Sequence, residues 1–218
     1  MKNARKHGFI YCEGYTEEAF VNEVLAPYLA KWSVAVRPII CTTSRTASRT
    51  YRGGASSYAK IKNELGILCK AHENKFITTM FDYYAMPANT PRIDCQERNI
   101  YRRMLIIEQA IDDDIARANF FFHFMLHEFE GLLFSDPSAF SLIANAAQVE
   151  DIRRVRGAAQ SPEHINNGYE TAPSKRIKRI VPNFGKVTSG VLLSKHMGIE
   201  CMLRECRHFS DWVDRMKA

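Results

Sequence analysis

Four acidic residues follow runs of strand-like hydrophobic residues at three places in the chain. They are Glu13 after segment 7–12, Asp82 after segment 76–81, and Glu128 and Glu130 after segment 120–126. If these segments are parallel strands, their carboxyl ends meet at one edge of the sheet, where open α/β folds bind ligands. Carboxylates gathered there repel one another unless a cation lies between them, and hard oxygen ligands favour Mg²⁺, Mn²⁺ or Ca²⁺. The sequence therefore predicts a divalent-metal site.

Several acids also have an ordinary structural interpretation. Glu13 lies in a strand-to-helix turn, and Asp82 is a residue type that commonly ends a strand. Glu17 is expected in the first turn of a helix, where a carboxylate complements the helix dipole. Asp136 precedes a proline and is expected to cap the helix that follows. Glu17 and Asp136 are therefore the weaker candidates for the site.

Glu128 and Glu130 give the sharpest signal. If the strand continues through them, both carboxylates project from one face, because side chains two residues apart lie on the same side of a strand. Burying two carboxylates side by side is costly without a cation or hydrogen bonds. If the segment is helical, the two side chains diverge and this reasoning weakens.

Basic residues are expected near the same edge. The candidates for holding phosphates are Arg45, Arg49 and Arg52 in the loop 42–57, and Lys175 and Arg176 after a proline that precedes a helix. The loop follows the second strand and so leaves the sheet at the acidic edge, where arginines can hold phosphates. Cations in a first helical turn are disfavoured by the dipole, which hints at a role for that pair. A solvated, purely structural surface is the alternative for both groups.

The elements alternate between strand and helix over the first part of the chain. Strands are expected at 9–12, 34–41, 76–81 and 120–126, with helices at 17–31, 58–71 and 97–116 between them. Further helices are expected at 137–146, 148–158, 174–181, 186–197 and 199–217. This order predicts an α/β fold with a mainly parallel central sheet flanked by helices. We expect a metal-binding domain at 1–140 and a helical C-terminal extension at 141–218 packed on it.

Composition narrows the class of protein. The chain has 218 residues and a formal charge of +6, which permits a polyanionic partner without requiring one. Its six cysteines form no CxxC pair, so we expect reduced thiols. Zinc is not expected, because Cys201 and Cys206 have no matching second pair. His123 and His208 have no ligand-like spacing and are expected to be structural. The absence of a long apolar segment or signal peptide predicts a cytoplasmic protein without membrane contact.

Four motifs together resemble an uncharacterised bacterial Toprim-like family, related to the nuclease domain of the overcoming-lysogenisation-defect (OLD) proteins. They lie at 13–17, 81–84, 127–134 and 170–176. In the Toprim fold, a glutamate after the first strand and an Asp-x-Asp pair after the third hold Mg²⁺. Glu13 and Asp82 match the first two positions, while Tyr84 stands where the second aspartate is expected. Glu128 and Glu130 resemble the acidic motif that OLD-type nucleases carry after the next strand.

The resemblance implies a Mg²⁺- or Mn²⁺-dependent phosphodiesterase, a nuclease acting on the backbone of DNA or RNA. Glu13, Asp82, Glu128 and Glu130 would be its metal-binding and catalytic residues. The resemblance also implies an ATPase partner of the AAA or SMC-like type and a role in phage defence, with self-association left open. One alternative is a non-catalytic regulatory or sensor subunit of such an ATPase. Another is a different Toprim phosphotransfer reaction, such as nucleotidyl transfer.

Overall fold

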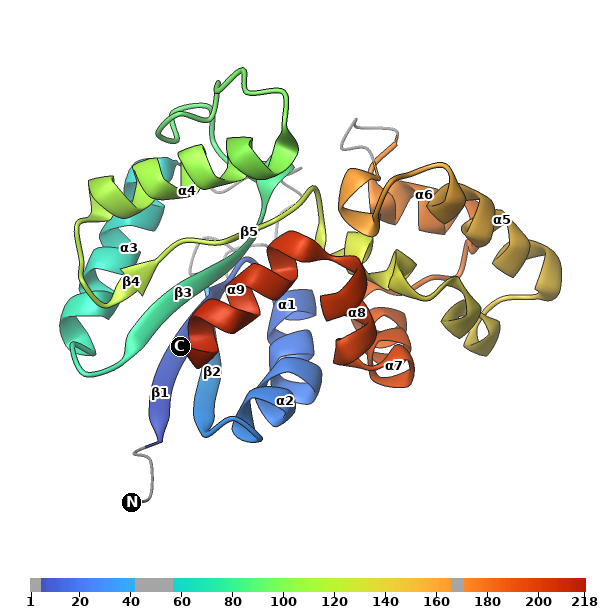
Figure 1. Cartoon of the computed structure of the whole chain (residues 1–218), viewed down its shortest axis with the longest axis horizontal. Helices are drawn as coiled ribbons and strands as arrows, with labels where there is room; N and C mark the ends of the chain where they lie inside the picture. The colour runs from blue at the N-terminus through green and yellow to red at the C-terminus, as the bar shows by residue number, and fades with distance from the viewer. Residues whose placement is uncertain (1–4, 42–56, 166–170) are drawn as a thin grey trace.

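The computed structural model describes residues 5–41, 57–165 and 171–218 (Figure 1). Arg45, Arg49 and Arg52, expected to hold phosphates, lie outside the described residues.

The central sheet is parallel throughout its described pairings. Its strands are β1 (Lys6–Cys12), β2 (Val34–Ile40), β3 (Phe76–Asp82), β4 (Phe120–Phe121) and β5 (Phe124–Met125). Their order is β2-β1-β3-β4, and β5 also pairs with β3 beyond β4. Parallel pairing brings the carboxyl ends of β1, β3 and β5 to one edge, as the sequence predicted. This arrangement confirms a mixed α/β fold and is consistent with a Toprim-like sheet.

The expected strand at 120–126 is interrupted rather than continuous. Between β4 and β5, the Thr79 hydroxyl donates to the carbonyl of His123 over 2.9 Å and accepts the N–H of His123 over 2.8 Å. A side chain of β3 thus replaces two ladder hydrogen bonds at this position. The backbone remains satisfied while the edge strand bends.

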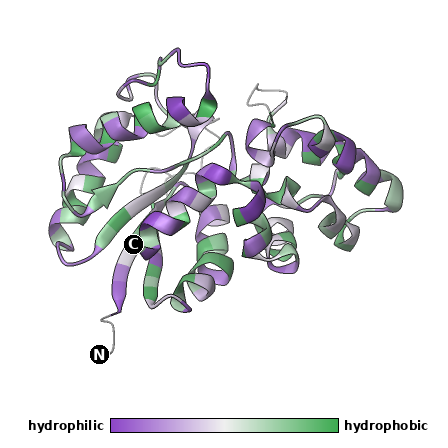
Figure 2. Cartoon of the chain, in the orientation of Figure 1, coloured by the Kyte–Doolittle hydropathy of each residue, from purple (hydrophilic) through white to green (hydrophobic). Residues whose placement is uncertain are grey.

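Helices cover both faces of the sheet. Those between the strands are the continuous run α1 (Tyr15–Phe20), η1 (Val21–Leu25) and α2 (Ala26–Ala30), then α3 (Tyr58–Ala71), η3 (Tyr83–Ala85) and α4 (Ile100–Ile115). Residues of alternating parity along β1 and β3 enter different hydrophobic clusters: Tyr11 and Phe81 pack with α3 and α4, whereas Cys12 and Met80 pack with α1 and α2. Figure 2 shows hydrophilic and hydrophobic stretches alternating along the helices, as expected when one helix face meets a core.

The C-terminal part is helical, as predicted. Its elements are η4 (Phe129–Ser135), η5 (Pro137–Leu142), α5 (Ala146–Gly157), η6 (Pro162–His164), α6 (Pro173–Ile180), α7 (Lys186–Met197), α8 (Ile199–Glu205) and α9 (Arg207–Lys217). The single helix expected at 199–217 is divided at Cys206, whose backbone is extended. The segment expected as a helix at 137–146 is a 3-10 helix that ends at Leu142.

The C-terminal helices share a hydrophobic core with the first half of the chain. One cluster contains Phe20 and Leu25 beside Phe209 and Trp212, so it joins residues on both sides of the predicted boundary at residue 140. Figure 1 shows α9 lying with α1 on the side of the sheet opposite α3 and α4. In the described ranges, no helix combines the length and apolar character needed to cross a membrane.

Candidate functional site

Acidic side chains from two strand ends and the segment after β5 meet at the carboxyl edge of the sheet. Glu13 follows β1, and its Oε2 accepts the backbone N–H of Asp82, the last residue of β3, over 3.3 Å. Asp82 Oδ1 in turn accepts the N–H of Phe129, which begins the segment after β5, over 3.0 Å. Hydrogen bonds to the Glu13 and Asp82 carboxylates therefore connect the three predicted motifs.

Glu128 and Glu130 reach this place by a route that differs from the expected one. His127 has a left-handed backbone (φ 69°), Glu128 is extended, and a 3-10 helix begins at Phe129. The expectation that the strand continues through both acids is therefore wrong. Nevertheless, the Nζ of Lys186 lies 3.0 Å from Glu130 Oε1 and 4.0 Å from Glu128 Oε1, so both carboxylates face one cation.

Lys186 is the functional candidate that the sequence reasoning missed. It is the first residue of α7, and it lies with Glu130 although 56 residues separate them in the chain. A cation at a helix N-terminus opposes the dipole. A cation in the first turn of a helix was the signal that singled out Lys175 and Arg176. The same signal would also have identified Lys186.

Glu128 anchors the start of α6. Its Oε2 accepts the backbone N–H of Ser174 over 2.8 Å, and its Oε1 accepts the Ser174 hydroxyl over 3.0 Å. A carboxylate at a helix N-terminus offsets the dipole, which explains why Lys175 and Arg176 are tolerated in the first turn. Lys175 is exposed and Arg176 is half-buried, its Nε donating to the carbonyl of Thr171 over 2.7 Å. Glu128 thus brings the predicted basic pair next to the acids.

Burial and mutual repulsion raise the pKa values of the clustered acids. Burial raises the pKa of Asp82 well above its usual range, with repulsion from Glu13, Glu17 and Glu130 added. Burial also raises the pKa of Glu13 and of Glu130, although Lys186 opposes the rise in both. The folded protein thus concentrates negative charge at this edge at an electrostatic cost. An additional cation at this edge would lower that cost.

Glu17 belongs to this cluster as well as to its helix. It is 7% exposed, and its Oε2 accepts the N–H of Gly14 over 2.9 Å at the start of α1. This contact fits its expected place in the first helical turn. Burial, followed by repulsion from Glu13, raises the pKa of Glu17 to about 7.

Lys186 is held as a cation by the same acids. Burial alone would lower the pKa of Lys186, but Glu130 and Glu128 outweigh burial and raise it. Its side chain remains 38% exposed, so it lies between the buried acids and solvent.

Asp136 has the structural role expected of it. Its Oδ1 accepts the backbone N–H of Ser138 over 2.9 Å and caps η5.

The donor set at the acidic edge suits a hard cation. It consists of carboxylate oxygens, and the buried Oε1 of Glu130 lies 3.0 Å from the Lys186 ammonium. Among the described residues, however, no three of the acids at this edge have ligand atoms that all lie within 4.8 Å of one another, and the group that meets this spacing is elsewhere. One atom each from Glu108, His123 and His208 lies within 4.8 Å of the other two.

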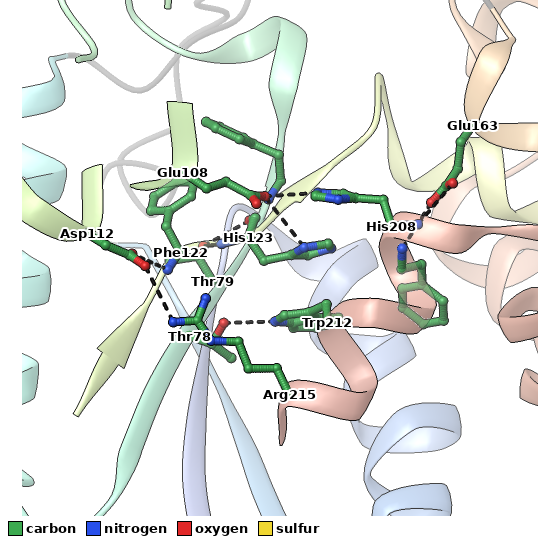
Figure 3. A network of polar contacts seen from close by, with 12 residues as sticks. Thr78, Thr79, Glu108, Asp112, Phe122, His123, Glu163, His208, Trp212 and Arg215 are labelled. Carbon is green, nitrogen blue, oxygen red and sulfur yellow. Dashed lines mark hydrogen bonds and ion pairs between the residues drawn. The ribbon is translucent and has the colours of Figure 1, made fainter. Parts of the chain in front are cut away.

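That second group forms a buried polar network at the free edge of the sheet (Figure 3). Glu108 lies in α4, His123 between β4 and β5, and His208 in α9. The sequence predicted structural roles for His123 and His208 and did not place them beside Glu108, because the three residues come from distant parts of the chain. Sequence spacing carries no signal for such a group.

Comparison with family models matches residues 12–217 to the Domain of unknown function (DUF4276) family. The chain belongs to this family. No curated protein and no solved structure matches it. The acidic edge, Lys186 and the histidine network of this DUF4276 chain all lie within the matched residues.

Proposed function

We propose that this DUF4276 protein is a metal-dependent phosphodiesterase that cleaves DNA or RNA, with the Toprim-like relationship to OLD nucleases that its motifs suggest. The observation that supports the proposal most strongly is the meeting of Glu13, Asp82 and Glu130 at one sheet edge beside Lys186. The pKa values of these acids are raised, as expected of carboxylates arranged to bind a cation.

The residues divide into two roles. Asp82 and Glu130 would hold Mg²⁺ or Mn²⁺, with Glu13 as a further ligand or the general base. The bound cation would supply water activation and offset charge on the leaving oxygen. Glu128 would hold α6 in place, since Ser174 already contacts both of its oxygens, and would reach a cation at most as an additional ligand.

Positive charge beside the acids would hold the substrate backbone. Lys186 is half-exposed at the acids, and Lys175 is exposed at the start of α6. With Arg176, they supply the cations that phosphates require. Arg45, Arg49 and Arg52, outside the described residues, remain further candidates for the same role. A partner ATPase of the AAA or SMC-like type and a role in phage defence complete the proposal and rest on the motif resemblance. The proposed cytoplasmic location rests on the lack of a long apolar segment in the sequence.

A non-catalytic sensor subunit of such an ATPase is the second candidate. The observation that favours it is the charge balance already present within the chain. Lys186 neutralises Glu130, and Ser174 satisfies Glu128, so part of the acidic edge is stable without a cation. In this alternative, the remaining acids would hold a structural ion.

A cleavage assay separates the two candidates. The full chain is incubated with plasmid DNA or single-stranded RNA in Mg²⁺, Mn²⁺ or EDTA, with and without a candidate ATPase of the AAA or SMC-like type. The nuclease proposal predicts cleavage with metal and none with EDTA. Cleavage that needs the ATPase still supports an effector subunit, whereas intact DNA and RNA under every condition would favour the sensor.

Variants locate the activity in the chain. We expect Asp82→Asn and Glu130→Gln each to reduce cleavage by at least about a hundredfold, because each removes a charged group from the proposed metal site. Glu73→Gln is the matched control, since Glu73 is exposed before β3, at the opposite end of the strand from Asp82. Wild-type cleavage by both site variants would contradict the assignment.

A further inference from the structure

The network around Glu108 lies where two helical layers meet the free edge of the sheet. Glu108 reaches it from α4, which belongs to one layer, and His208 reaches it from α9, which belongs to the other. His123 comes from the interruption between β4 and β5, so the irregular edge strand places it between the helices.

The donor atoms have spacings suited to a transition metal. Glu108 Oε1 lies 2.9 Å from His208 Nε2 and 3.6 Å from His123 Nδ1. Ligands about 2.0 Å from a tetrahedral Zn²⁺ ion lie about 3.3 Å from one another. Small side-chain adjustments would therefore place all three atoms around one ion.

Hydrogen bonding leaves His123 incompletely satisfied. The residue is 2% exposed, its Nε2 has no hydrogen-bond partner, and the 3.6 Å from its Nδ1 to Glu108 exceeds a good hydrogen bond. A buried imidazole without these bonds carries a desolvation cost. Metal coordination through Nδ1 would give the side of the ring that faces Glu108 a strong interaction, while Nε2 would still have no hydrogen-bond partner among the described residues.

Surrounding groups hold the three side chains in place, as is usual around bound metals. The N–H of Phe124 donates to Glu108 over 2.8 Å, and Trp212 stacks on His123 with ring centres 4.4 Å apart. Glu163 accepts the backbone N–H of His208 over 3.1 Å and fixes the start of α9 (Figure 3).

We propose that Glu108, His123 and His208 bind one Zn²⁺ ion that joins α4, the edge strand and α9. Two imidazoles and a carboxylate favour zinc over Mg²⁺, which prefers oxygen ligands. A cavity of about 100 Å³ borders all three residues and is also lined by Tyr101, Arg207 and Arg215. It leaves room for a water or a small anion in the fourth position. This site is separate from the acidic edge and does not depend on the proposed nuclease activity.

Metal analysis of the full chain tests the proposal. After dialysis against a weak chelator, the wild-type protein is expected to retain one zinc ion per chain by mass spectrometry. Replacement by Co²⁺ should give the visible absorption bands of a four- or five-coordinate site, which excess Zn²⁺ abolishes. A wild-type protein that retains no zinc and gives no such bands would overturn the proposal and leave a metal-free hydrogen-bonded triad.

Variants assign the ion to these residues. We expect Glu108→Gln and His208→Gln to lose the zinc, whereas His196→Gln, on the exposed side of α7, and Glu130→Gln, at the acidic edge, retain it. Circular dichroism establishes whether each variant is folded. If the ligand variants do not fold, the cobalt spectrum and X-ray absorption of the wild-type protein test the proposal. Nitrogen ligation from two imidazoles would support it, and the absence of such ligation would overturn it. Full zinc retention in folded ligand variants would also overturn the proposal.

Discussion

At the scale of single residues, the acidic edge is a balance between repelling carboxylates and one ammonium group. Burial raises the pKa values of Glu13, Glu17 and Asp82, and repulsion from Glu13 adds to the rise at Glu17 and Asp82. Lys186 opposes the rise at Glu13 and Glu130. The clustered carboxylates can carry more negative charge than Lys186 neutralises, and a divalent cation would stabilise this excess. Stability and cation binding should therefore be linked through pH.

The sign of that linkage follows from Glu17. Its carboxyl has a pKa of about 7 in the folded protein, against about 4.3 in an unfolded chain. Between these values the folded state binds more protons, so the free energy of unfolding falls as pH rises through this window. Without metal, we expect thermal stability to be lower at about pH 8 than at about pH 5 on account of this group.

Mg²⁺ should reverse part of that loss. Thermal melts with and without Mg²⁺ are expected to show the larger rise in melting temperature at the higher pH. For a chain of this size, about 2–4 °C corresponds to 1 kcal/mol. Comparing the two melts at each pH removes the contribution of other titrating groups, including His123, whose pKa burial lowers. The difference should shrink in Glu17→Gln, and an equal Mg²⁺ effect at both pH values would contradict this account.

Individual residues were predictable where their position in a strand determined their environment. Glu13 and Asp82 follow clear strands, so parallel pairing was enough to place them together. Lys186 was missed because its approach to Glu130 depends on how α7 packs, which is a tertiary property. Glu108, His123 and His208 were missed for the same reason.

At the scale of elements, α6 depends on a carboxylate from another segment. Its N-cap, Ala172, offers no side-chain hydrogen bond, and Glu128 supplies the acceptor instead. The break between β4 and β5 likewise depends on Thr79. Hydrophobic periodicity predicted these elements, but the periodicity contains no information about side chains that cap or interrupt them from elsewhere.

Removing the Ser174 hydroxyl tests the anchoring of α6. Ser174→Ala deletes one hydrogen bond to the buried Glu128 carboxylate, and we expect it to reduce the free energy of unfolding by about 1.5–3 kcal/mol, the range for bonds to charged groups. Urea denaturation measures the change. Ser141→Ala, at an exposed position in η5, is the control and should be within about 0.5 kcal/mol of wild type. A neutral Ser174→Ala would mean that the hydroxyl bond to Glu128 does not stabilise α6.

At the scale of the whole molecule, the C-terminal helices complete the core instead of standing beside it. Phe209, Trp212 and Val213 are buried in the same cluster as residues of β1 and α1, and the Trp212 indole donates to Thr78 in β3 over 2.8 Å. The class of fold could be predicted from alternating strands and helices. How closely α9 packs on the sheet could not, because that contact joins residues far apart in sequence.

A truncated chain tests this dependence. Residues 1–140 alone lack α9, and we expect them to show no cooperative thermal unfolding, since the sheet face that α9 covers would be exposed to water. Circular dichroism and calorimetry of the fragment, beside the full chain, provide the measurement. A cooperative transition in the fragment would establish residues 1–140 as an independent domain.

The central claim is that the acidic edge binds a divalent cation, and Mn²⁺ binding followed by electron paramagnetic resonance tests it most directly. The amount of bound Mn²⁺ should rise with the concentration of the full chain, and added Mg²⁺ should compete with Mn²⁺ for the site. The double variant Asp82→Asn/Glu130→Gln should lose this binding, while His208→Gln should keep it. Equal Mn²⁺ binding by wild type and the double variant, or no binding by wild type, would contradict the account.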